Sequence, residues 1–219
     1  MTVVRIVFWR HGQTEQNRLR RIQGSSDIPL NDTGMNEARA AAKELARMKP
    51  TRIYSSQLGR ALNTAQYLAD ETGLEIKVDE RLRERGYGLW EGLTSDEIKA
   101  SYAEQWQTWR DGLEPVDVDV ETRKDTGDRV VEAVLDAIAD VEAESLEAGA
   151  EETIVFVAHG GSISNGIISL LGQNPSEWVG LQGMDNCRWA ILEPRPGANP
   201  QWRLRSYNRR TVMAPNIIH

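Results

Sequence analysis

The chain has 219 residues, 40% of them hydrophobic and 27% charged, a composition typical of a folded globular protein rather than a disordered one. The formal net charge of -7 argues against a nucleic-acid partner, because such proteins present a basic surface. No apolar run reaches the roughly 20 residues of a membrane span, and the single Cys187 cannot form an internal disulfide. We therefore expect a cytoplasmic protein that binds no membrane.

Strand and helix signals alternate along the first half of the chain. Strands are indicated by short β-branched and aromatic runs, helices by apolar residues at helical spacing, and loops by clusters of turn formers. The predicted elements are a strand at 3–9, a loop at 18–33, a helix at 35–45 capped by Asp32 or Thr33, a strand at 52–54, a helix from Ser56 to Gly73, and a strand at 75–78.

The alternation continues in the second half. The predicted elements are a helix at 94–111 that starts with a Thr94–Glu97 capping box, an irregular segment at 113–126, a helix at 130–141, a strand at 153–158, a helix at 162–171, and a terminal hairpin of 188–192 with 202–207. Such alternation predicts a layered α/β fold.

Two of the three histidines stand in the same local context. His11-Gly12 and His159-Gly160 each follow an apolar strand directly, whereas His219 is the last residue. In open α/β sheets ligands bind beyond the carboxyl ends of the strands. A histidine at a strand end can simply be a satisfied hydrogen-bonding group, but the repeated pattern favours a shared site.

Arginines accompany both histidines. Arg10 directly precedes His11, and Arg60 falls in the first turn of the helix that follows Ser56. A guanidinium grips phosphate oxygens in a planar fork. Gly160 and Gly161 open a predicted helix, whose N-terminal amides favour an anion. Arg60 alone would be read as a solvated surface charge; beside the histidines it indicates a phosphate site.

These residues fall into four ordered blocks. The blocks are Arg10-His11-Gly12-Gln13-Thr14 with Asn17, Gln23-Gly24 and Asp27-Ile28-Pro29-Leu30; Ser55-Ser56 with Arg60-Ala61 and Thr64-Ala65; Leu82-Arg83-Glu84 with Gly88-Leu89-Trp90-Glu91-Gly92; and Val157-Ala158-His159-Gly160-Gly161. Together they resemble the histidine phosphatase superfamily, which includes the cofactor-dependent phosphoglycerate mutases. The resemblance implies a three-layer α/β/α sandwich with a mostly parallel central sheet. It also implies one domain over residues 1–219, with a helical and irregular insert at about 93–127 covering the site.

The resemblance also implies a role for each matching residue. The implied roles are His11 as nucleophile, Arg10, Arg60 and His159 around the transferring phosphoryl group, Glu84 as proton donor and then base, and Asn17, Gln23, Gly24 and the Gly160 backbone as the phosphate pocket. His11 must be neutral to attack, and the cations beside it should lower its pKa. His159 is expected to act as a cation. We expect no metal and no cofactor, since two arginines would repel a metal ion.

Several motifs separate hydrolysis from mutase activity. Arg85-Gly86-Tyr87-Gly88 lacks the histidine typical of the mutases, and Trp90-Glu91-Gly92 is similar to the phosphatase branch. Val120-Glu121-Thr122 stands where many phosphatases carry Gly-Glu-Ser. The residues that form the substrate-side wall of the site therefore do not follow from the resemblance. The tail 183–189 resembles actinobacterial members. We expect hydrolysis of a small phosphorylated metabolite, glucosyl-3-phosphoglycerate or a related ester. The alternatives are a cofactor-dependent phosphoglycerate mutase and a non-catalytic phosphate-binding regulatory protein.

Three features stay open at this point. Arg18, Arg20 and Arg21 could bind a second anionic group of the substrate, or form a solvated basic loop. Trp106 and Trp109 could stack on a sugar, or pack in a core. The family resemblance allows a homodimer.

Overall fold

The computed structural model describes residues 3–144 and 151–211, so His219 lies outside the described residues. One mixed sheet has the strand order β3-β2-β4-β1-β5-β6. The strands are β1 (Val3–Arg10), β2 (Arg52–Ser55), β3 (Ile76–Val78), β4 (Glu151–Ala158), β5 (Trp189–Pro194) and β6 (Trp202–Arg209). The pairs that join β3, β2, β4 and β1 are parallel, whereas β5 runs antiparallel to both β1 and β6. The mostly parallel sheet and the terminal hairpin predicted from the sequence are therefore present.

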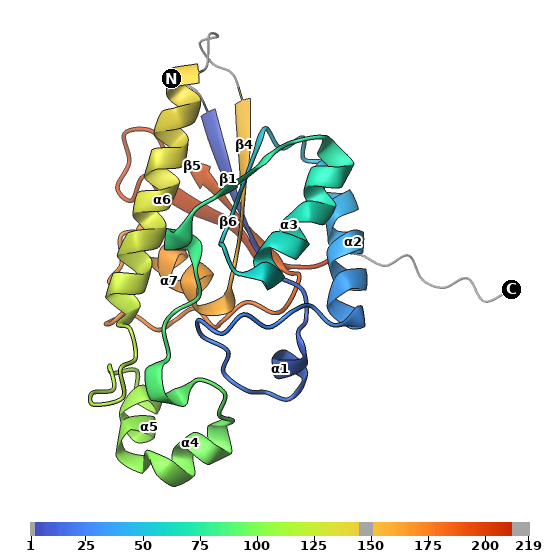
Figure 1. The fold of residues 1–219 in the computed structure, drawn as a ribbon. Helices are drawn as coiled ribbons and strands as arrows, with labels where there is room; N and C mark the ends of the chain where they lie inside the picture. Colours follow the sequence, from blue (N-terminus) through green and yellow to red (C-terminus); the bar gives the residue numbers. More distant parts are fainter. Residues whose placement is uncertain (1–2, 145–150, 212–219) are drawn as a thin grey trace, which may run out of the picture.

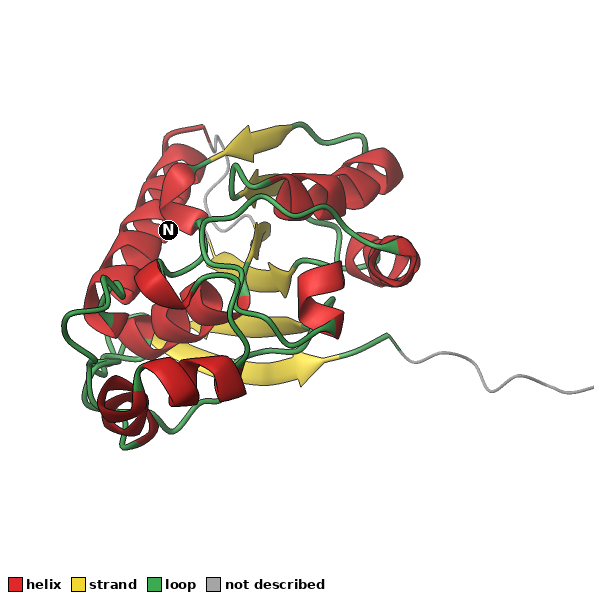
Figure 2. Cartoon of the chain, turned by 60° about the horizontal axis from the view of Figure 1, so that its bottom comes forward, coloured by secondary structure: helices red, strands yellow, loops and turns green. Residues whose placement is uncertain are grey.

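Helices cover both faces of the sheet (Figures 1 and 2). The pair α2 (Asp32–Ala46) and α3 (Gly59–Thr72) packs on one face, and α6 (Arg123–Glu144) and α7 (Gly160–Leu170) pack on the other. This is the three-layer α/β/α sandwich that the resemblance implied. No helix in the two described ranges is long and apolar enough to cross a membrane.

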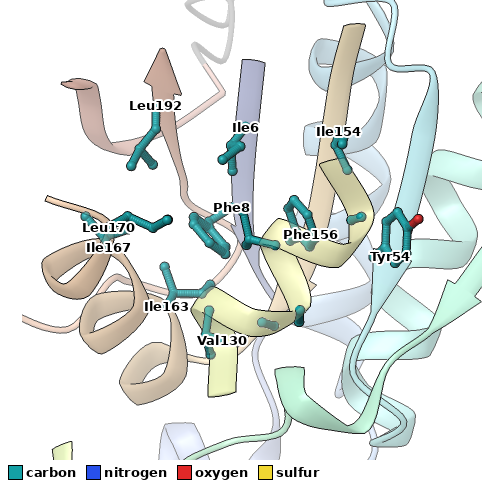
Figure 3. Packing of buried hydrophobic residues seen from close by; sticks show 14 of the residues in the cluster. Ile6, Phe8, Tyr54, Val130, Ile154, Phe156, Ile163, Ile167, Leu170 and Leu192 are labelled. Atoms are coloured by element: carbon teal, nitrogen blue, oxygen red, sulfur yellow. The ribbon is translucent and has the colours of Figure 1, made fainter. Parts of the chain in front are cut away.

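Strand β1 shows why its stretch from Ile6 to Trp9 is continuously apolar. Ile6 and Phe8 point into the cluster formed with α6 and α7, whereas Val7 and Trp9 point into the cluster with α2 and α3. All four are 0% exposed, and Phe8 meets Phe156 of β4 at 5.5 Å between ring centroids (Figure 3). A strand buried on both faces needs apolar side chains at every position. This burial fixes β1 and β4 side by side, and with them the residues that follow each strand.

Shorter elements lie beyond the carboxyl ends of the strands, and the labelled α-helices among them are at the bottom of Figure 1. They are α1 (Glu15–Arg18), the single-turn helices η1 (Glu80–Leu82) and η2 (Gly88–Trp90), α4 (Ser95–Ser101) and α5 (Ala103–Arg110). The predicted continuous helix at 94–111 is wrong, because Tyr102 leaves the helical region with φ -137° and ψ 50°. Within α5 the ring centroids of Trp106 and Trp109 lie 5.2 Å apart, and they lie 6.3 and 6.2 Å from the ring centroid of Trp90 in edge-to-face arrangements.

Other helix starts differ from the predicted ones, and one cap comes from a remote residue. Asn31, rather than Asp32 or Thr33, caps α2 by accepting from the Gly34 N–H at 2.9 Å. Helix α3 is capped from the loop, where Asp27 accepts from the Gly59 N–H at 2.8 Å. Helix α6 begins at Arg123, earlier than predicted, and α7 begins at Gly160, the glycine expected to open it. The predicted Thr94–Glu97 capping box and the left-handed Gly73 that ends α3 are both present.

Candidate active site

His11 lies directly beyond the carboxyl end of β1, buried to 1% exposure. Its Nδ1 is 2.7 Å from the Gly12 carbonyl oxygen. Because a carbonyl can only accept, Nδ1 carries the proton and Nε2 keeps its lone pair. Burial first, and then the charges of Arg10 and Arg60, hold the pKa of His11 well below its ordinary value of 6.5. The imidazole is therefore neutral at pH 7 and able to act as a nucleophile.

His159 follows β4, the parallel neighbour of β1, and its ring centroid is 5.1 Å from that of His11. The Arg60 Nε–H donates to its Nδ1 at 3.2 Å, so the Nε2–H is the donor to the Ser56 hydroxyl at 2.8 Å. Burial, followed by Arg60 and His11, lowers its pKa well below 6.5. The expectation of a cationic His159 is wrong for this structure, because one ring nitrogen accepts from a guanidinium.

Arg60 is 0% exposed, which rules out the solvated surface charge. Besides His159, it donates to the Ser26 carbonyl at 2.6 Å and to the Gly24 carbonyl at 2.8 Å. A guanidinium has five N–H donors, so two remain after these bonds. Arg60 thus joins the loop after α1 to His159 and keeps donors for an anion.

Arg10, which is half-buried, is the second guanidinium of the site. One of its terminal nitrogens donates to the Met184 carbonyl, and a Cβ placed on Gly160 would lie 3.4 Å from its central carbon. Its Nε is buried and has no hydrogen-bond partner among the described residues. An unsatisfied buried donor costs roughly 1–3 kcal/mol. A cationic donor in that position is suited to a phosphate oxygen.

Glu84 is held at the N-terminus of α7. Its Oε1 accepts from the N–H groups of Arg85 at 2.8 Å and Ser162 at 2.9 Å, and its Oε2 accepts from Gly161 N–H at 3.2 Å. The free amides at this end of the helix supply donors for the carboxylate oxygens. The amides that the sequence assigned to a bound anion therefore hold the carboxylate of the protein itself, while Gly160 packs on Arg10.

Asn17 and Gln23 are oriented by Thr14, a buried residue that the sequence analysis did not single out. The Asn17 amide oxygen accepts from the Thr14 N–H and from Asn186 Nδ2, both at 3.1 Å. The Gln23 amide oxygen accepts from the Thr14 hydroxyl at 2.8 Å. With both oxygens engaged, the two NH₂ groups are left as donors. Thr14 belongs to the first motif block, and Asn186 lies in the tail 183–189, which the sequence did not connect to the site.

Gly24 shows why a glycine is needed in this loop. Its φ is +53°, and a Cβ would lie 1.9 Å from the Glu91 carboxylate, which binds the Ser25 N–H at 3.0 Å. Both the left-handed backbone and the close approach exclude a side chain. The loop can therefore pass between Arg60 and Glu91.

A cavity of about 700 Å³ opens over these groups. Its lining includes Arg10, Asn17, Gln23, Gly24, Glu84 and Gly160, whereas His11, Arg60 and His159 are buried behind them. Its other wall includes Trp106 and Trp109, which both pack in the core of the insert and line the cavity. Thus segments far apart in the sequence meet at one site.

The three loop arginines separate in the structure. Arg18 pairs with Glu15 on the surface, and Arg20 is exposed. Arg21 lines the cavity, although Glu97 and the Gly92 carbonyl each accept from it at 2.7 Å. Within residues 3–144 and 151–211, no three His, Cys, Asp or Glu side chains are grouped as metal ligands would be.

Comparisons with known proteins give a consistent result. The model of the histidine phosphatase superfamily (branch 1) matches residues 6–210. A glucosyl-3-phosphoglycerate phosphatase of Mycolicibacterium vanbaalenii is 37% identical over 226 aligned residues, covering all of both chains. A 2,3-bisphosphoglycerate-dependent phosphoglycerate mutase of Brucella ovis is 36% identical over 178 residues, or 78% of this chain and 84% of the mutase. The solved mycobacterial glucosyl-3-phosphoglycerate phosphatase in complex with VO3 superposes with a TM-score of 0.83 at 37% identity, covering 93% of this chain and 98% of that one.

Proposed function

The chain belongs to the histidine phosphatase superfamily (branch 1), and from this membership and the geometry of the site we propose that it hydrolyses a small phosphate monoester through a phosphohistidine on His11. The observation that carries the proposal is the Nδ1–H bond from His11 to the Gly12 carbonyl at 2.7 Å. It leaves the Nε2 lone pair free in a buried site beside two guanidinium groups.

The reaction has two displacements at phosphorus. His11 Nε2 attacks, so that an N–P bond forms while the ester O–P bond breaks, and Glu84 gives its proton to the leaving oxygen. Water then attacks phosphorus, loses a proton to Glu84, and releases His11 and inorganic phosphate. Arg10 and Arg60 neutralise the phosphoryl oxygens throughout, and the NH₂ groups of Asn17 and Gln23 orient them. Positioning and charge neutralisation supply most of the catalysis in phosphoryl transfer.

We propose glucosyl-3-phosphoglycerate, or a similarly phosphorylated sugar acid, as the substrate. The full-length similarity to phosphatases of that name and the size of the cavity, about 700 Å³, support this substrate. The indoles of Trp106 and Trp109 at its wall suit a sugar ring. The mutase alternative has less support, because Gly86 stands where mutases typically carry histidine and the similarity to the Brucella mutase covers 78% of this chain.

Trapping tests the class of activity. Brief incubation with a ³²P-labelled ester and a quench in alkali should leave an acid-labile label on the protein, and His11→Ala should remove it. A non-catalytic phosphate-binding protein would give no label. Production of 2-phosphoglycerate from 3-phosphoglycerate and 2,3-bisphosphoglycerate would instead support the mutase. A panel of phosphorylated metabolites ranked by kcat/KM tests the substrate, and a flat ranking would contradict it.

The organisation of the chain belongs to the same proposal. We propose a single domain over residues 1–219, in which the segment 93–127 covers the site; Ser95, Trp109 and Gly112 of that segment line the cavity. The buried single Cys187 fits a reducing cytoplasm. A homodimer stays a prediction, which light scattering would check.

A further inference from the structure

The segment that carries Glu84 lies between η1 and η2 and belongs to neither. A chain without helix or sheet bonds needs other partners for its buried carbonyl groups. Arg129, on α6, binds three carbonyl groups of this part of the chain, one in η1 and two in the segment that follows it. It donates to the carbonyl oxygens of Arg81 at 2.6 Å, Arg83 at 2.8 Å and Glu84 at 3.1 Å.

The remaining donors of Arg129 bind one carboxylate. Its Nε donates to Glu121 Oε1 at 2.8 Å, and a terminal nitrogen donates to Oε2 at 3.0 Å. All five N–H groups of the guanidinium are therefore used. The Arg129 side chain is 10% exposed and that of Glu121 is 16% exposed, so solvent competes little with these bonds.

Glu121 holds the same segment from its other side. Its Oε2 accepts from the Gly86 N–H at 2.9 Å, its backbone N–H donates to the Gly86 carbonyl at 2.9 Å, and its Oε1 accepts from Arg83 at 3.1 Å. Burial alone would raise the pKa of Glu121, but the hydrogen bonds from Arg129 and Gly86 lower it below its ordinary value. The pair thus binds the backbone before and after Glu84.

We infer that Arg129, oriented by Glu121, is a positioning residue for Glu84, and that it fixes where the proton is delivered to the leaving oxygen. The inference rests on the proposed function. The Glu84 carboxylate is held at Gly161 and Ser162 of α7, while its backbone is held by α6 through Arg129. The two helices together set its place.

This role separates proton transfer from attack on phosphorus. Arg129 donates no hydrogen bond to His11, Arg10 or Arg60 among its five bonds. Loosening the segment should therefore move the proton donor and leave the nucleophile and the phosphate clamp in place. With an ester whose leaving group needs no proton, the rate of the first step, phosphorylation of His11, should therefore change little.

The experiment compares two esters in rapid-quench kinetics. Glucosyl-3-phosphoglycerate has a poor alkoxide leaving group, whereas p-nitrophenyl phosphate releases a stable phenolate whose burst reports attack by His11. Arg129→Lys keeps the charge but cannot span three carbonyl groups and a carboxylate. Glu121→Gln is the second variant and keeps Arg129. Arg52→Met, which removes the surface pair with Glu144, is the control for loss of a partly buried arginine.

General acid catalysis typically contributes 10²–10⁴-fold, so we expect Arg129→Lys to slow phosphorylation by the sugar ester about 30-fold. The p-nitrophenolate burst should slow less than about threefold, with slower turnover afterwards because Glu84 also activates water. Glu121→Gln should show the same selectivity with a smaller loss, and thermal unfolding checks that each variant is folded. If a folded variant lost the same factor in phosphorylation rate with both esters, the positioning role would be overturned while the proposed function would stand. Absence of a burst and of phosphohistidine in the unchanged protein would overturn the proposed function, and this role with it.

Discussion

Acid should destabilise this protein through His11 and His159. In the unfolded chain each imidazole takes up a proton with a pKa of about 6.5. In the folded protein burial, followed by neighbouring arginines, holds both pKa values well below that. Below pH 6.5 the unfolded state therefore binds more protons than the folded state. The contribution of the two histidines to the free energy of unfolding is fully present above pH 6.5 and is lost as the pH drops toward the lowered pKa values.

The magnitude follows from proton uptake by the unfolded chain alone. Between pH 7.5 and 5.5, each histidine that stays neutral in the folded state lowers the free energy of unfolding by about 1.4 kcal/mol. The two together lower it by about 2.7 kcal/mol. Domains are stable by only about 5–15 kcal/mol, so the loss is measurable.

His11→Asn isolates one of the two protons. Its amide can still donate to the Gly12 carbonyl, but it does not titrate. Urea unfolding at pH 7.5 and 5.5 should show that the unchanged protein loses about 1.4 kcal/mol more than the variant. Glu37, whose pKa burial raises, works in the opposite direction but is common to both proteins and cancels. Equal losses would show that His11 is not held neutral, and would refute the reasoning.

Three substitutions test single contacts of the site. Gly24→Ala should lower the melting temperature and slow turnover, because φ is +53° and the new Cβ would lie 1.9 Å from Glu91; an unchanged melting curve would contradict this geometry. Gly161→Ala should reduce kcat at least about 10-fold at little cost in KM, since its Cβ would lie 2.8 Å from Glu84 Oε1; a selective rise in KM would argue against it. Thr14→Val removes the hydroxyl that holds Gln23 and should weaken inhibition by inorganic phosphate about fivefold, or ~1 kcal/mol, as titration of that inhibitor would show.

Local signals in the sequence were sufficient where neighbours along the chain determine the structure. The capping box at Thr94 and the left-handed Gly73 depend on residues within one helical turn, and both are present. The break at Tyr102 has no such local signal, and the two indoles that follow it on α5 pack against Trp90, a residue outside that helix. Caps supplied by remote residues, such as Asp27 for α3, were missed for the same reason.

The sequence by itself determined the α/β class and the position of two histidines at the ends of buried strands, since a strand buried on both faces can be recognised from its apolar composition. That these two strands are neighbours in the sheet came only from the structure. Only the tertiary structure decided three features: which nitrogen of His159 carries the proton, the hydrogen bonds from α7 to the Glu84 carboxylate, and the hydrogen bonds from Arg129 to the backbone around Glu84. Glu84 and Gly161 are 77 positions apart, and His159 and Arg60 are 99 apart. Contacts across such separations follow from how the layers pack, and the proton that each imidazole keeps follows from which donors that packing brings against it.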